Sequence, residues 1–144
     1  MTHAGAPLGA NAIRALLLAF PLAIASAANI ACSTKPEGAR TVESPRHTLA
    51  YRTTPAKLAV GKPFTVDLVV CPKDSQASII SIEVDARMPE HRHGMNYKAT
   101  VKPQADGRYR AEGLMFHMPG RWEFMFDIRD AHGVEHLTHD TTIR

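Results

Sequence analysis

Two histidines and two methionines lie within one short segment of this 144-residue sequence, from Met88 to Met95. Imidazole and thioether groups together suit copper, because the soft methionine sulfur prefers Cu(I) while histidine binds either oxidation state. An extended backbone would place His91 and His93 on one side, and Gly94 would let the chain turn Met95 back towards them. This loop alone therefore offers three candidate copper ligands.

A second cluster, Met115–Phe116–His117–Met118, stands directly before a Pro-Gly pair, which predicts that it ends a strand at a turn. If both clusters lie at the same end of the fold, His117 or a methionine completes the set of ligands. Plainer interpretations remain open for these residues. The histidines could be solvated loop residues, and one of the two methionines could simply fill the core, as could Met88.

The elements that must position these clusters are short strands. From residue 48 onward the sequence alternates between apolar and polar residues with a period of two, and turn-forming residues interrupt it at short intervals. Strands are predicted at 48–52, 64–70, 80–88, 97–101, 109–114, 122–129 and 135–143, with a hairpin turn around 105–107. About seven strands without helical periodicity predict an all-β fold, an immunoglobulin-like β-sandwich.

The N-terminal segment is typical of exported proteins. Residues 15–25 form an apolar run that follows Arg14, long enough for a signal peptide and shorter than the ~20 residues that span a membrane. We expect residues 1–31 to be a signal peptide or lipoprotein leader, 32–46 a polar linker, and 47–144 the β-sandwich domain. The protein would then be exported, either to the periplasm or to the envelope on a lipid anchor.

The two cysteines leave alternatives open. Ala25-Ser26-Ala27 suits ordinary cleavage, whereas the residues before Cys32 approximate a lipoprotein site, at which Cys32 would be acylated. Cys71 ends an apolar stretch, and we interpret it first as a small buried residue, with a copper-ligand role as the minority view. If Cys32 is not acylated, a Cys32–Cys71 disulfide can form, since an oxidising compartment favours paired thiols.

Charge and motifs exclude several classes of protein. The net charge is +3, and basic and acidic residues are interleaved rather than clustered, so we expect no nucleic-acid partner. Neither a phosphate-binding loop nor a nucleophile motif is recognisable, and Glu90 has no obvious carboxylate partner, so we do not expect an enzyme. We interpret His132, His136 and His139 as surface residues, the last two on opposite faces of one strand.

Residues 85–95 and 113–123, which hold the two clusters, resemble the YtkA-like domain family, with the hairpin between them in the expected order. The similarity covers roughly residues 47–144. It implies an immunoglobulin-like sandwich of the bacterial envelope, often a lipoprotein, whose relatives are suspected of handling copper or of assisting respiratory metalloproteins. Through this resemblance the ligand set carries over to His91, His93, Met95, His117 and Met118. Arg92 stands where the family has a small residue, usually glycine.

The sequence thus favours an envelope copper-binding protein, a Cu(I) chaperone or buffer with a His/Met site. Its partner would be a respiratory or membrane metalloprotein that receives the copper, and its own contact with the membrane would be limited to a lipid anchor at Cys32. The alternative is an interaction module without a metal, in which the same loops assist a membrane or respiratory complex and the methionines supply adaptable apolar contacts.

Overall fold

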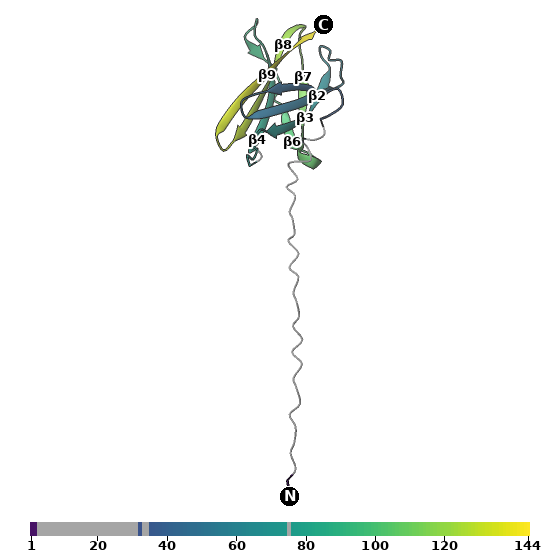
Figure 1. Cartoon of the computed structure of the whole chain (residues 1–144). Helices are drawn as coiled ribbons and strands as arrows, with labels where there is room; N and C mark the ends of the chain where they lie inside the picture. The colour runs from purple at the N-terminus through teal and green to yellow at the C-terminus, as the bar shows by residue number, and fades with distance from the viewer. Residues whose placement is uncertain (3–31, 33–34, 75) are drawn as a thin grey trace.

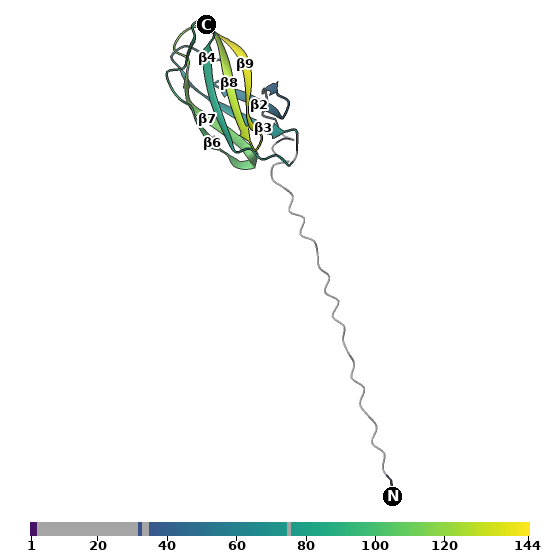
Figure 2. The same cartoon turned by 90° about the vertical axis from the view of Figure 1, so that its left-hand side faces the viewer.

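The computed structural model describes residues 1–2, 32, 35–74 and 76–144, and this part folds into two antiparallel sheets (Figure 1). One sheet has the strand order β1-β2-β3-β7-β6 and the other the order β5-β4-β8-β9. Figure 2 shows β4, β8 and β9 side by side in the second sheet. The strands are β1 (Arg40–Glu43), β2 (His47–Thr54), β3 (Pro63–Pro72), β4 (Ser81–Met88), β5 (His93–Gly94), β6 (Thr100–Pro103), β7 (Arg108–Met115), β8 (Gly120–Asp130) and β9 (Gly133–Ile143).

Alternation along the strands builds the core between the sheets. In β8 the side chains of Trp122, Phe124, Phe126 and Ile128 are fully buried, and the residues between them lie on the outer face. Because successive side chains of a strand point to opposite faces, this pattern specifies which face of the sheet is covered. Across the core, Tyr51 of β2 packs its ring against Phe124 and Phe126 at centroid distances of 5.6 and 4.8 Å.

The all-β sandwich predicted from the sequence is confirmed, with nine strands among the described residues instead of about seven. The two additional strands are the short edge strands β1 and β5, of four and two residues. Residues 40–43, which the sequence assigned to the polar linker, pair as β1 with β2 through Arg40 opposite Tyr51. The turn expected around residues 105–107 is a short 3-10 helix, η1 (Ala105–Gly107), between β6 and β7. β6 begins at Thr100, so residues 97–99 lie before it.

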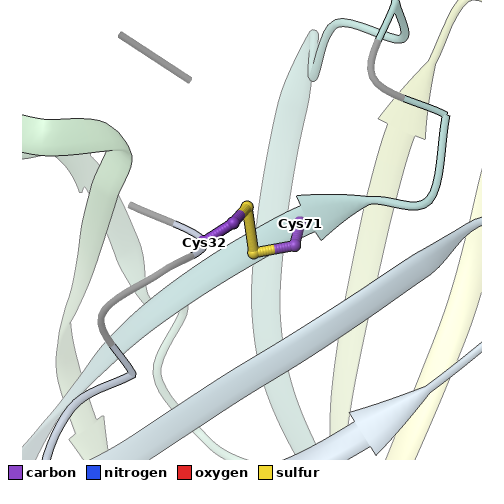
Figure 3. The surroundings of a disulfide bond; sticks show 2 residues. All are labelled: Cys32 and Cys71. Atoms are coloured by element: carbon purple, nitrogen blue, oxygen red, sulfur yellow. A yellow bond between two sulfur atoms is a disulfide. The ribbon is translucent and has the colours of Figure 1, made fainter. Parts of the chain in front are cut away.

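Cys32 and Cys71 form a disulfide, with their Cα atoms 5.6 Å apart (Figure 3). The interpretation of Cys71 as a free buried residue is therefore wrong, and so is the minority view of it as a copper ligand. Cys71 lies near the end of β3, whereas the start of β3 at Pro63 pairs with Met115, so the disulfide is at the end of the sandwich opposite the second cluster. The sulfur of Cys32 is occupied in this pairing and cannot carry a lipid at the same time.

A buried polar network joins the two sheets at the disulfide end. His47 is fully buried, and its Nδ1 donates to a carboxylate oxygen of Glu135 at 2.8 Å, while its Nε2 lies 3.5 Å from Asp130. Arg46 donates from Nε to the Asp130 carboxylate at 2.9 Å, and the hydroxyl of Ser44 bonds to Glu135. Since Asp130 and Glu135 lie at the β8–β9 turn, this network fixes β2 against the other sheet.

Acid is expected to weaken the fold through Glu135 and Asp130. Burial alone would raise the pKa of Glu135, but hydrogen bonds from Ser44 and His47 outweigh this effect and lower it. The pKa of Asp130 is lowered in the same way, because hydrogen bonds from Arg46 and from the His132 amide outweigh the effect of burial. A carboxyl whose pKa is lower in the folded state stabilises the fold above its unfolded pKa of about 4, and this contribution is lost as the pH falls through the folded value. Urea unfolding of wild type and Glu135→Gln between pH 7 and pH 3 should show a smaller loss in the variant; parallel losses would contradict the assignment.

The predicted leader, residues 1–31, lies almost wholly outside the described residues, so its signal function stays a prediction. None of the helices that the structure describes is long and apolar enough to cross a membrane.

Candidate metal centre

The first cluster lies on a tight hairpin between β4 and β5. Met88 pairs with His93 across the hairpin, and the amides of His91 and Arg92 both donate to the Met88 carbonyl, at 3.2 and 2.9 Å. Arg92 closes the turn with a φ of 56°, and it is the one described non-glycine residue with a positive φ. Because Met88 faces the core, its partner His93 lies on the inner side of this edge, while His91 is exposed on the turn.

The second cluster lies on the connection between β7 and β8 and is held at two points. The carbonyl of Phe116 accepts a hydrogen bond from the Gly61 amide at 2.8 Å, and the ring of Phe116 is fully buried. The carbonyl of Met118 accepts a hydrogen bond from Nε1 of Trp122 at 3.1 Å. His117 stands between these two anchored residues, so the position of its backbone is determined by the core.

The two clusters meet at one end of the sandwich. The ring centroids of His93 and His117 are 5.1 Å apart, and both rings approach Trp122, at 5.9 and 5.3 Å. The ring of His91 lies 5.8 Å from that of His93. Metal–nitrogen bonds of about 2 Å mean that two imidazoles at such a separation can bind one ion. The convergence on which a copper site depends is therefore present for His93 and His117.

His93 and His117 each have a ring nitrogen that makes no hydrogen bond within the described residues and is available to bind a metal ion. Nδ1 of His93 lies 3.1 Å from the Gly94 carbonyl, which can only accept, so Nδ1 carries the proton and Nε2 has a free lone pair. Nδ1 of His117 is buried and has no hydrogen-bond partner among the described residues. An unpartnered buried polar atom costs about 1–3 kcal/mol. A cation bound at Nδ1 would remove this cost.

The two methionines of the predicted ligand set flank the histidine pair. Met95 and Met118 are half-buried and both pack against the core. The amide of Met95 donates to the Ala86 carbonyl at 3.0 Å, which continues the pairing of β5 with β4. His93 and Met95 are two residues apart on this extended segment, so their side chains share its inner face. Met115, the other methionine of the second cluster, is half-buried at the end of β7.

Met88 is a core residue, as its place in the alternating pattern predicted, and it lies opposite His93 in the pairing of β4 with β5. It is almost fully buried, and a Cβ added to Gly120 would lie 2.7 Å from its Cε. Gly120 has a φ of +128°, a conformation that residues with a side chain rarely adopt.

Gly120→Ala is expected to destabilise the fold by about 2 kcal/mol, mostly through backbone strain, with a smaller cost for shifting the flexible end of Met88 within the core. Gly113→Ala is the matched control, since Gly113 has a φ of +84° but its added Cβ would meet the Lys98 carbonyl only at 3.5 Å. Urea unfolding should show the larger loss for Gly120→Ala. Equal losses would mean that contact with Met88 contributes nothing.

Ion pairs that the sequence pattern does not predict hold the turn of the first cluster to β8 and β9. Arg121 of β8 donates from Nε to Glu90 on the turn at 2.7 Å and from Nη1 to Asp140 of β9 at 3.0 Å. The hydrogen bond from Arg121 lowers the pKa of the Glu90 carboxyl. Glu90 is therefore engaged with Arg121 instead of being free to act as an acid or a ligand.

Nitrogen and oxygen donors alone do not make a metal site here. Among the residues that the structure describes, no three His, Cys, Asp or Glu side chains are grouped to hold a metal ion, so a site needs the thioethers.

The C-terminal histidines lie elsewhere. His136 is exposed, as predicted, and pairs with Asp127 at 2.8 Å. The prediction that His139 is a surface residue is wrong, because His139 lies on the same face of β9 as the buried Glu135 and Leu137. Its Nδ1 lies 2.7 Å from the Tyr51 hydroxyl.

Comparisons with known proteins agree with this architecture. A family model described as YtkA-like matches residues 50–127, a range that includes both clusters. No curated protein matches the chain. Among solved structures, a DUF4426 family protein from Pseudomonas aeruginosa PAO1 superimposes with a TM-score of 0.52 at 8% sequence identity, covering 74% of this chain and 94% of that one. At this identity the likeness concerns the fold alone.

Proposed function

This chain belongs to the YtkA-like family, and we propose that it is a copper-binding protein of the cell envelope, a Cu(I) chaperone or buffer. The observation that carries the proposal is the approach of His93 to His117, at 5.1 Å between ring centroids. These two residues are separated by 24 positions. His93 begins the edge strand β5 of the second sheet, and His117 lies on the connection from β7 of the first sheet to β8 of the second.

The donors at this end fit Cu(I) better than other ions. His93 offers Nε2 and His117 offers a buried Nδ1 that has no partner among the described residues. Met95 and Met118 supply soft thioethers from the two segments that carry the histidines, and His91 stands exposed at the rim of the site. Thioether sulfur selects Cu(I), and neither donor type has to lose a proton from its neutral form to bind. Of the five predicted residues, we propose His93, His117, Met95 and Met118 as the ligands of the ion, with His91 at the rim of the site, where it can assist exchange of the ion.

The position of the site suits transfer of copper to a partner. His91 and the Pro89–Gly94 turn are at the surface of the molecule, so a bound ion is accessible to the ligands of a receiving metalloprotein. His93 lines an open hollow of about 530 Å³ beside β4. Shallow, exposed sites allow ligand exchange between two proteins, which a chaperone or buffer needs and a resident redox cofactor does not.

Two further observations support export. The apolar segment at 15–25 is typical of a signal peptide, and the Cys32–Cys71 disulfide is of a kind that persists in oxidising compartments. The disulfide lies at the end of the sandwich opposite the histidine pair.

Titration of the purified protein with Cu(I) under anaerobic conditions, in competition with a chromophoric Cu(I) chelator, tests the proposal. We expect one equivalent to bind with a dissociation constant well below micromolar. Bound Cu(I) should also protect Met95 from oxidation by peroxide, because coordination engages one lone pair of the sulfur and makes the sulfur less nucleophilic and less accessible to the oxidant. Binding no tighter than micromolar, with equal sulfoxide yields at Met95 in both forms, would contradict a copper function and would favour an interaction module without a metal.

A further inference from the structure

A polar hollow of about 620 Å³ opens between the edges of the two sheets, away from the histidine pair. It lies between β1 and β2 of one sheet and β9 of the other. Because β9 and β5 are opposite edges of the second sheet, the hollow and the candidate copper ligands are on different sides of the sandwich. Its volume is within the range of about 300–1,000 Å³ that is usual for small-molecule sites.

The walls of the hollow carry an excess of positive charge. Arg40, Arg52, Lys57 and Arg144 line it, against one acidic residue, Glu37. Arg52 shares Asp67 with a neighbouring arginine, at 3.4 Å. The other three basic side chains form no ion pair with the carboxylates of the described residues. Like charges that converge on one concave surface and outnumber their counter-ions attract an anion.

Arg40 is placed towards the interior of the sandwich by the pairing of β1 with β2. It lies directly opposite Tyr51, and residues directly opposite in a strand pair project from the same face of the sheet. Tyr51 points into the core and is 1% exposed, so Arg40 is at the mouth of the space between the sheets. A guanidinium in this place offers paired N–H donors that match a carboxylate or a phosphate.

The floor of the hollow is neutral and fixed. The Tyr51 hydroxyl lies 2.7 Å from Nδ1 of His139. Burial, together with the charge of Arg40, lowers the pKa of His139 below its usual value, so its imidazole is uncharged at neutral pH and accepts this hydrogen bond. The remaining lining mixes threonine hydroxyls with the apolar side chains of Leu58, Phe124 and Ile143.

We propose that this hollow, between β1 and β9, is a binding site for a small organic anion. Its carboxylate or phosphate head would pair with Arg40 and Arg144, and its apolar body would contact Leu58 and Ala56, the apolar side chains of the lining that are not buried. The lining combines both chemistries, which distinguishes it from a site for an inorganic ion. The proposal does not depend on copper binding, since no candidate copper ligand lines the hollow.

Amide chemical-shift titrations with four probes test the proposal: benzoate, acetate, phenyl phosphate and inorganic phosphate, all at constant ionic strength. We expect saturable shifts near Tyr51 and Thr141, and at least about tenfold tighter binding of the aromatic probe than of its head group alone, since burial of apolar surface adds to charge pairing. Comparing benzoate with phenyl phosphate identifies the preferred head. Shifts without saturation, or equal affinity for acetate and benzoate, would overturn the proposal.

Matched substitutions separate a specific site from general attraction by positive charge. Arg40→Gln and Arg144→Gln each remove one exposed cation of the lining and should weaken binding at least about fivefold. Arg129→Gln, which removes an exposed arginine near the opposite end of β8, should change it less than twofold. Circular dichroism and thermal unfolding verify that each variant is folded. Equal weakening by all three variants would mean that only the net charge of the protein attracts the anion.

Discussion

Replacing His117 by alanine is expected to weaken Cu(I) binding by a factor on the order of 100, which at 25 °C corresponds to about 2.7 kcal/mol. His117 supplies the buried Nδ1 that has no protein partner in the described part of the chain, and its ring is the one nearest to His93 across the two loops. Loss of one of the two central imidazoles leaves His93 and the thioethers, a set with one nitrogen donor fewer at the centre of the site. Competition with a chromophoric Cu(I) chelator measures the change.

The choice of control variants makes this result specific. His136→Ala removes an exposed histidine that pairs with Asp127 on the outer face of the second sheet, and it should leave Cu(I) affinity unchanged. His93→Ala should match His117→Ala, and His91→Ala should have a smaller effect because His91 is exposed on the turn. If His117→Ala and His136→Ala bind Cu(I) equally well, the approach of the two rings has no role in metal binding. Unfolding curves in urea show whether any variant is also destabilised.

Removal of the disulfide by Cys71→Ser is expected to lower the free energy of unfolding by about 4 kcal/mol, the value that chain entropy gives for a loop of this length. The two cysteines are separated by 39 positions, and the loop between them contains β1, β2 and most of β3. Without the cross-link the unfolded chain gains freedom throughout this segment. Urea unfolding without reductant measures the loss.

Two controls distinguish the bond from the serine substitution itself. Cys32→Ser, and the double variant, should show the same loss as Cys71→Ser, because either change removes the same bond. Cu(I) affinity should be unchanged in all three, since the disulfide and the histidine pair are at opposite ends of β3 and its neighbours. A loss below about 1 kcal/mol in the single variants would mean that the bond contributes little to stability.

The core of this fold could be predicted from the sequence because its strands are long and alternate strictly. Trp122, Phe124, Phe126 and Ile128 specify the inner face of β8 without any knowledge of their neighbours. The edge strands could not be predicted in this way. β5 has two residues, and β1 has four of which one is partly buried, so neither is long enough to show a period. Their existence depends on pairing with β4 and β2.

Residues whose role depends on register were the hardest to interpret. The spacing of His136 and His139 correctly predicted that they lie on opposite faces of the strand. It did not show which of these histidines points towards the core. The pairing of His139 with the buried Phe124 across β8 and β9 determines this. The sequence likewise supplied both clusters of candidate ligands and not their distance. That distance depends on the pairing of β4 with β8, which places Arg87 opposite Glu123 and so brings the two connections to the same end.

The left-handed backbone at Arg92 has a consequence for which ions reach the candidate ligands. A residue with a side chain is less stable in this conformation than glycine by roughly 1–2 kcal/mol, so the turn holds a cationic side chain where glycine would fit without strain. Arg92 and His93 line the same shallow hollow beside β4. At any given distance the guanidinium repels a divalent ion twice as strongly as a monovalent one. Under the proposed function, this turn therefore discriminates by valence and disfavours Zn²⁺ and Cu²⁺ relative to Cu⁺.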